Sequence, residues 1–235
     1  MNFKAVFFDL GGTLFRYGDV RGHFDEMLRD LARQYAIEAP FEEIQRAYRE
    51  AMASTMAEYG ARPYYLHREM FTAAYRELLA RFDRDSMDDD ALYRGQSSAG
   101  VSAVTPRRGV TETLAELRAR GLHLGIVSNI DDDQFEPLWE QIGLGEYFDA
   151  TTTSEEARSC KPDAGIYRHA LAKAPGVSAE QVVFVGDSPS HDVVGARRLG
   201  MTTVWITSKP RRLGDEQQPH HTISEIPELL EILGG

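Results

Sequence analysis

The sequence of 235 residues is poor in cysteine, in long apolar segments and in positive charge. Cys160 is the single cysteine, so no intrachain disulfide can form, and we expect the protein in a reducing cytoplasm. No apolar run approaches the ~20 residues that a membrane-spanning helix needs, and the first residues lack the pattern of a secretory signal. The 37 acidic residues outnumber the 26 basic ones, and the net charge of −11 disfavours binding to nucleic acid or to an anionic membrane.

Five short runs of apolar, β-branched and aromatic residues predict strands, and amphipathic helical patterns separate the later four. The predicted strands are residues 4–8, 123–127, 148–152, 182–186 and 202–206. The predicted helices are residues 111–120, 135–142, 166–174 and 192–199. Strands that alternate with helices predict a parallel sheet in a doubly wound α/β fold.

The stretch between the first and second predicted strands is different, because it is rich in helical patterns and contains no convincing strand. Its long amphipathic candidates are residues 24–35, 41–58 and 66–82, with a weaker fourth at 88–95. Pro106 and Gly109 mark the return to the alternating pattern. We therefore predict an α/β core built from residues 1–15 and 106–235, with an all-helical insert at residues 16–105.

Polar residues follow the predicted strands at the points where ligands bind in a doubly wound sheet, outside the carboxyl ends of the strands. In chain order they are Asp9, Ser128, Asn129, Lys161, Asp187 and Asp192. Because parallel strands end at the same edge, we expect these carboxylates, the hydroxyl, the amide and the ammonium group to lie close together.

This set of groups suits phosphoryl transfer, in which an enzyme positions a phosphoryl group and neutralises its charge. A carboxylate can attack phosphorus and form an acyl phosphate, which water then hydrolyses. Two anions repel each other, so a cation must screen both, and Mg²⁺ accepts carboxylate and phosphate oxygens. The candidate carboxylates are Asp9, Asp187 and Asp192, while Lys161 and Ser128 would hold phosphate oxygens.

The ordered set resembles the four motifs of the haloacid dehalogenase superfamily. The residues that carry the resemblance are Asp9 with Thr13, Ser128, Lys161, and Gly186-Asp187 with Asp192. The resemblance implies a Rossmann-like core whose inserted helical cap selects the substrate. It also implies a Mg²⁺-dependent phosphatase that acts on a small phosphorylated metabolite through an aspartyl-phosphate intermediate on Asp9.

The resemblance further implies a role for each matching residue. Asp9, Ser128 and Lys161 would be the catalytic residues, with Asp9 as nucleophile and Lys161 paired to it. The implied metal ligands are Asp9, the backbone carbonyl of Gly11, Asp187 and Asp192. The phosphate would be bound by Gly12, Ser128, Asn129 and Lys161.

Gly11 departs from the pattern of the family's phosphatases, which usually carry a second aspartate two residues after the nucleophile. That aspartate protonates the leaving group and then activates water, and such assistance is worth roughly 10²–10⁴-fold in rate. Glycine has no side chain that could carry a proton. Candidate replacements are a water molecule, His23, His67, Asp131, Asp132 and Asp133.

Three interpretations therefore stay open at this point. The protein could be a phosphatase with a substituted proton carrier, or a dehalogenase or phosphonatase-type hydrolase. It could also be a module that binds a phosphorylated metabolite or a protein partner with little turnover. Sugar phosphates, nucleotides and small acid phosphates all remain as substrates, and the sequence leaves both a monomer and a homodimer open.

Overall fold

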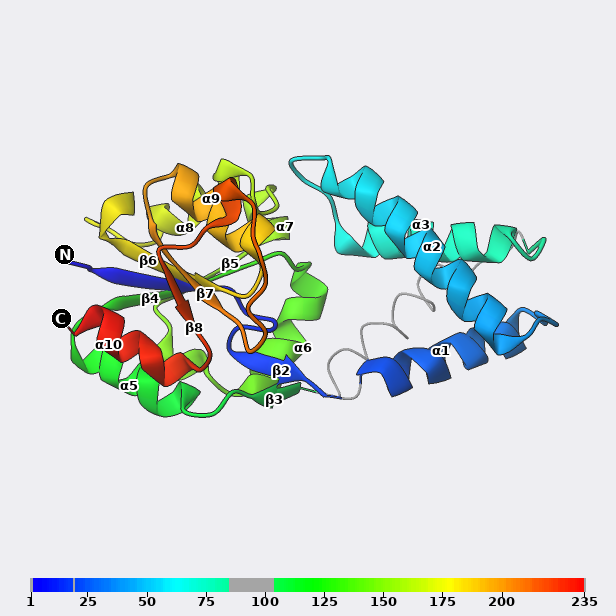
Figure 1. The fold of residues 1–235 in the computed structure, drawn as a ribbon, viewed down its shortest axis with the longest axis horizontal. Coiled ribbons are helices and arrows are strands. Elements are labelled where there is room, and N and C mark those ends of the chain that lie inside the picture. Colours follow the sequence, from blue (N-terminus) through cyan, green and yellow to red (C-terminus); the bar gives the residue numbers. More distant parts are fainter. Residues whose placement is uncertain (1, 19, 85–103, 235) are drawn as a thin grey trace. The chain divides into compact units, whose positions relative to one another are not determined.

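The computed structural model describes residues 2–18, 20–84 and 104–234 (Figure 1). The chain divides into two compact units, Met1–Arg16 with Thr105–Gly235, and Tyr17–Val104. The weak helix predicted at residues 88–95 lies outside the described residues. Among the residues that are described, no helix is both long and apolar enough to span a membrane.

The first unit contains a six-stranded sheet whose pairings are all parallel. In sheet order the strands are β5 (Ala150–Thr153), β4 (His123–Ser128), β1 (Ala5–Phe8), β6 (Val182–Gly186), β7 (Thr202–Ile206) and β8 (His221–Ile223). The chain runs outward from β1 to β5 and then returns on the other side of β1, so the strand order reverses between β1 and β6. This confirms the doubly wound prediction and adds β8, an edge strand too short for its pattern to be recognised.

Helices cover both faces of this sheet, with α5 and α10 along one face and α8 and α9 along the other (Figure 1). The α-helices of the unit are α5 (Val110–Ala119), α6 (Asp132–Ile142), α7 (Ser154–Ala157), α8 (Ala164–Ala172), α9 (Val194–Arg198) and α10 (Leu229–Leu233). Short 3₁₀ turns lie at Gly145–Tyr147, Ala179–Gln181, Asp215–Gln217 and Ile226–Glu228, and a π turn at Pro189–Val193 leads into α9.

The central strand β1 is buried on both faces of the sheet. All four of its residues are buried, and Ala5 lies opposite His123 on one neighbour and Val182 on the other. Phe7 joins Tyr167 of α8 in a single apolar cluster on one face. A strand with no polar face is typical of parallel sheets that helices cover on both sides.

The second unit is helical, with α1 (Val20–Gln34), α2 (Phe41–Gly60) and α3 (His67–Ala80) among its described residues. The three long helices that the sequence predicts are therefore present. Tyr48 of α2 stacks on Tyr75 of α3 with ring centroids 5.8 Å apart, inside an apolar cluster formed by these helices.

The prediction that the insert contains no strand is wrong at its two ends. β2 (Phe15–Tyr17) and β3 (Val104–Pro106) pair as a two-stranded sheet where the chain leaves and re-enters the first unit. Each strand has three residues, too few to show the alternation that marks a strand in a sequence.

Gly195 on α9 packs directly against Tyr167, because a Cβ atom at residue 195 would lie 2.5 Å from the Tyr167 hydroxyl. Tyr167 is fully buried. Gly195→Ala should therefore destabilise the protein by about 1–3 kcal/mol through overpacking.

Gly60→Ala on α2 is the matched control, since a Cβ there meets nothing within 4 Å and alanine favours a helix. Urea unfolding followed by circular dichroism measures both variants. Equal unfolding midpoints for the two would contradict this account of the packing.

Candidate active site

The loop after β1 holds the side chain of Asp9 in a fixed direction. The Asp9 backbone N–H donates to the Val185 carbonyl at 2.9 Å, which extends the pairing of β1 with β6 by one residue. Thr13 Oγ1 then donates to Asp9 Oδ2 at 2.9 Å. Gly12 between them has a φ of +82°, and a Cβ there would overlap the Asp187 carboxylate, so only glycine fits.

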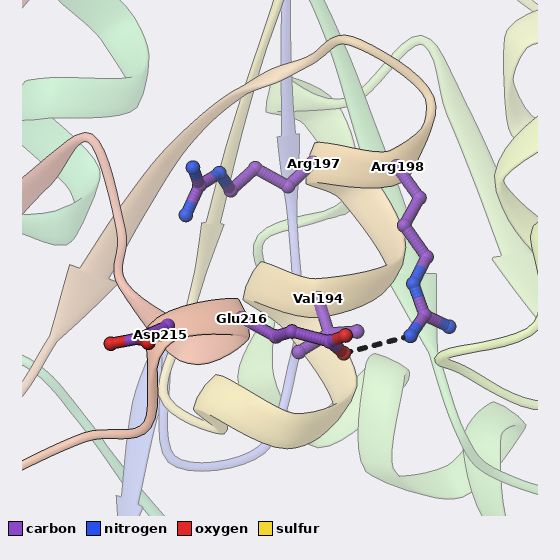
Figure 2. Close-up of a pocket in the computed structure, with 5 residues that line it drawn as sticks. All are labelled: Val194, Arg197, Arg198, Asp215 and Glu216. Carbon is purple, nitrogen blue, oxygen red and sulfur yellow. Dashed lines mark hydrogen bonds and ion pairs between the residues drawn. The ribbon is translucent and has the colours of Figure 1, made fainter.

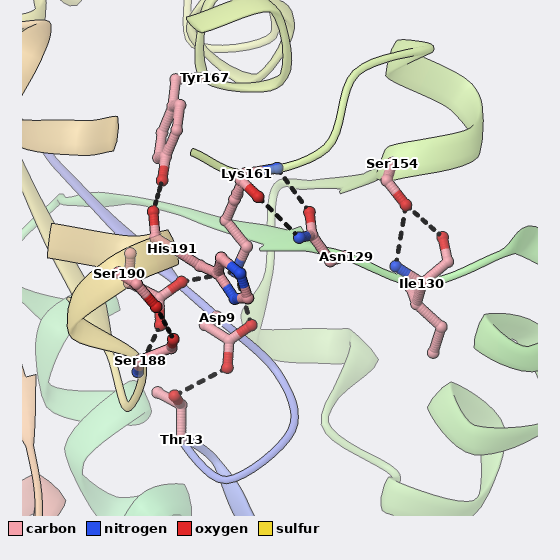
Figure 3. A network of polar contacts seen from close by, with 11 residues as sticks. Asp9, Thr13, Asn129, Ile130, Ser154, Lys161, Tyr167, Ser188, Ser190 and His191 are labelled. Atoms are coloured by element: carbon pink, nitrogen blue, oxygen red, sulfur yellow. Dashed lines mark hydrogen bonds and ion pairs between the residues drawn. The ribbon is translucent and has the colours of Figure 1, made fainter. Parts of the chain in front are cut away.

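Lys161 is the centre of the site (Figure 3). Its side chain is 2% exposed, and Nζ donates to Asp9 Oδ1 and to Asp192 Oδ1 at 2.7 Å each. The resemblance implied the contact with Asp9. The contact with Asp192 was not predicted, and it ties the end of β1 to the turn that follows β6.

The three carboxylates of the site share more negative charge than Lys161 can neutralise. Asp9, Asp187 and Asp192 each offer an oxygen, and these oxygens lie within 4.8 Å of one another. Asp9 and Asp192 are buried, while Asp187 is exposed at the edge of the group. Hard oxygen donors at this spacing suit a small divalent cation such as Mg²⁺.

Titration behaviour reflects this crowding. Loss of water around Asp187, together with the charges of Asp9 and Asp192, raises the pKa of Asp187 to about 7, although its residue stays accessible. Burial raises the pKa of Asp192 to about 6 against the opposing effect of Lys161. Burial also disfavours the charged form of Lys161, but the two carboxylates outweigh it, so the pKa of Lys161 is raised and the ammonium persists.

Ser128 is the last residue of β4, and Asn129 directly follows the strand. Ser128 is buried and lies in register with Thr153 of β5. Asn129, which was expected to bind phosphate, forms hydrogen bonds to the backbone of Lys161 through both the nitrogen and the oxygen of its side-chain amide. Its Nδ2 donates to the Lys161 carbonyl at 3.0 Å, and its Oδ1 accepts from the Lys161 N–H at 2.7 Å.

Two residues that sequence reasoning missed hold the loop that carries Asp187 and Asp192. Trp205 of β7 donates from Nε1 to the Asp187 carbonyl at 2.9 Å, and Tyr167 of α8 donates to the His191 carbonyl at 2.6 Å. Both are separated from the acidic loop along the chain, so no local spacing could have indicated them.

A family model of haloacid dehalogenase-like hydrolases matches residues 3–200. The chain belongs to this family. The glyceraldehyde 3-phosphate phosphatase of Methanocaldococcus jannaschii is 28% identical over 98% of this chain and 96% of its own. The ribulose-1,5-bisphosphate 5-phosphatase of Halopiger xanaduensis is 27% identical over 97% of this chain and 98% of its own. A solved L-2-haloacid dehalogenase structure covers both chains completely with a TM-score of 0.73 at 24% identity, which shows a shared fold alone.

The groups considered as replacements for the missing aspartate of this hydrolase lie in different surroundings. Asp132 accepts a hydrogen bond from Thr153 Oγ1, and Asp131 and Asp133 form a second acidic group with Glu155. His67 belongs to the second unit, where its ring centroid lies 5.0 Å from that of Tyr65. The side chain of His23 lies outside the described part of the structure.

A separate hollow on the first unit contains none of the predicted site residues (Figure 2). It is lined by Val194, Arg197, Arg198, Asp215 and Glu216. Arg198 pairs with Glu216 at 3.0 Å, and Arg197 donates to the Gln218 carbonyl at 2.6 Å. Because two arginines and two carboxylates line it, the hollow has no excess of positive charge that would favour an anionic substrate.

The raised pKa values predict how the metal-free protein responds to pH. The folded state holds protons on Asp187 and Asp192 that the unfolded chain, with a pKa of 3.8 at each, has already released. Stability should therefore fall as the pH rises from about 5 to about 7, and Mg²⁺ should restore it at the upper end.

Thermal unfolding in a chelator and in Mg²⁺ measures this effect. Asp187→Asn is the control, because removing one of the two proton-binding groups should flatten the pH dependence. A metal-free protein whose stability is constant or increases over this range would show that the carboxylates are not crowded as described.

Proposed function

We propose that this hydrolase is a Mg²⁺-dependent phosphatase that acts on a small phosphorylated metabolite. The observation that carries the proposal is the buried Lys161 ammonium between Asp9 and Asp192, with Asp187 beside them. Such a group can neutralise both a carboxylate nucleophile and the phosphate it attacks, provided that a divalent cation adds to the charge of the lysine. The two relatives named above are phosphatases of small sugar phosphates, which supports this substrate class.

The metal would be held by oxygen donors that follow β1 and β6. They are the carboxylates of Asp9, Asp187 and Asp192 and the backbone carbonyl of Gly11. The donor set fits Mg²⁺, since three carboxylate oxygens within 4.8 Å of one another otherwise repel. A bound ion would screen the charge of these carboxylates and of the phosphate oxygens.

Asp9 is the nucleophile in this proposal. Thr13 and Lys161 each hold one oxygen of its carboxylate, which fixes the orientation of the group before substrate arrives. Attack forms a bond between an Asp9 oxygen and phosphorus and breaks the bond from phosphorus to the leaving oxygen. Water then cleaves the aspartyl phosphate and releases phosphate.

The remaining residues bind and position the phosphoryl group. Ser128, Lys161 and the backbone at Gly12 would hold the non-reacting oxygens. Asn129 would act indirectly, by holding the backbone of Lys161 in place with its amide. The helical unit Tyr17–Val104 would serve as the cap that selects the substrate.

Gly11 favours a second candidate function, a protein that binds a phosphorylated metabolite without turning it over. A dehalogenase is less well supported, because halide displacement gains nothing from three clustered carboxylates. A phosphonatase would need a lysine in the helical unit, and the four lysines of the chain all belong to the first unit. The lysines are Lys4, Lys161, Lys173 and Lys209.

Asp9→Asn tests the proposal, because it removes the nucleophile while keeping the shape of the side chain. Phosphate release from a panel of phosphorylated metabolites should require Mg²⁺ and should fall on the order of 10³-fold or more in the variant. Asp215→Asn, which changes an exposed aspartate of the same unit, should leave the rate unchanged.

The proposal fails if the wild-type protein releases no phosphate from any compound of the panel. Calorimetric binding of a phosphate ester without hydrolysis would then support the binding module.

Gly11→Asp tests whether a missing proton donor limits turnover. The variant should increase kcat for alkyl phosphates, whose leaving groups need protonation, by up to about 10²-fold. It should affect para-nitrophenyl phosphate much less, because that leaving group departs without a proton. Gly11→Asn is the matched control, as it has the same shape and carries no acidic proton.

Steady-state rates on both substrate classes measure the effect. If Gly11→Asp and Gly11→Asn behave alike on alkyl phosphates, another group already supplies the proton.

A further inference from the structure

Arg107 donates hydrogen bonds to two backbone carbonyls of the loop that follows the nucleophile. Its backbone N–H donates to the Leu14 carbonyl at 2.9 Å. Its guanidinium donates through Nε, at 2.9 Å, and through Nη2 to the Gly12 carbonyl. One residue that follows β3 therefore fixes the carbonyls on both sides of Thr13, although it lies more than ninety positions further along the chain.

The loop that Arg107 holds carries the groups that orient the nucleophile. Thr13 lies between the two residues whose carbonyls bind Arg107, and its hydroxyl donates to Asp9 Oδ2. Gly12 lies against the carboxylate of Asp187. A rotation of the peptide groups at Gly12 or Leu14 would therefore move the Thr13 hydroxyl and change the direction of the Asp9 carboxylate.

The surroundings of the guanidinium are unusual for an arginine that only supports a surface. Nη1 is buried and has no hydrogen-bond partner among the described residues. Burial and the charge of Arg16 lower the pKa of Arg107, while the charges of Glu225 and Asp187 favour its charged form. A buried donor without a partner is unfavourable for folding, so the guanidinium stabilises the protein less than its two bonds to the Gly12 carbonyl alone would suggest.

We propose that Arg107 is a positioning residue of the active site, which holds the Gly12–Leu14 turn so that Thr13 orients Asp9 for attack. The inference rests on the proposed phosphatase function. The planar fork of arginine is required because Nε and Nη2 bind the same carbonyl, whereas lysine offers a single flexible ammonium.

The experiment compares Arg107→Met, Arg107→Lys and a matched control, Arg118→Met, in the full-length protein. Arg118 also donates to a backbone carbonyl, that of Tyr147, and pairs with Asp149 directly before β5. That place is at the amino ends of the strands, opposite the site. Three quantities are measured for each protein: kcat and KM, the affinity for Mg²⁺ by calorimetry, and the melting temperature without metal.

Arg107→Met should lower kcat about tenfold or more while KM changes much less, because the substitution disturbs the orientation of the nucleophile and not the binding of substrate. Its affinity for Mg²⁺ should fall as well, since Gly11, whose carbonyl is a proposed ligand, directly precedes this turn. Arg107→Lys should show most of the same decrease in kcat. The melting temperature of Arg107→Met should fall no further than that of Arg118→Met.

The proposal is overturned if Arg107→Met keeps the kcat and the Mg²⁺ affinity of Arg118→Met, or if Arg107→Lys restores full activity. A fall in melting temperature alone, with kcat unchanged, would also overturn it in favour of a structural role. A wild-type protein that binds Mg²⁺ but releases no phosphate would instead refute the phosphatase proposal, and the calorimetric comparison of the variants would still decide the role of Arg107.

Discussion

The pairing of one buried ammonium with two buried carboxylates is the constraint on which the rest of the site depends. Lys161 can neutralise Asp9 and Asp192 only in part, and Asp187 adds a third negative charge next to them. Glycines are needed at residues 12 and 186, because a Cβ at either place would overlap one of these carboxylates. The excess negative charge explains why a divalent cation fits this edge of the sheet.

The side chains of the site come from different helices, strands and loops, and a separate hydrogen bond holds each of these segments in place. Thr13 orients Asp9, Asn129 holds the backbone of Lys161, and Trp205 and Tyr167 hold the acidic loop. These supports leave the charged groups few alternative arrangements, which is what a preorganised phosphoryl-transfer site requires. Because Lys161 is outnumbered by three carboxylates in a protein with a net charge of −11, an anionic substrate would depend on a bound divalent cation to offset the negative charge of the site.

Much of this arrangement could be predicted from the sequence, because strand ends in a parallel sheet share one edge. That rule is enough to place Asp9 and Asp187 together, whereas Lys161 follows β5 only after the short helix α7 and was placed by its position in the ordered set. It could not predict that Lys161 also contacts Asp192, or that the amide of Asn129 is occupied by the backbone of Lys161. Such contacts depend on side-chain directions and on loop conformation. The short pairing of β2 with β3 was missed for another reason, since three residues are too few to show a period.

The central claim is that Asp9 becomes phosphorylated during the reaction, and single-turnover labelling tests it most directly. A substrate with a labelled phosphoryl group is mixed with the enzyme and Mg²⁺, the reaction is stopped with acid, and the protein is digested and mapped. The account predicts a transient label on the peptide that contains Asp9, which appears before free phosphate does. Release of labelled phosphate with no labelled Asp9 at any time, or a label on another residue, would contradict it.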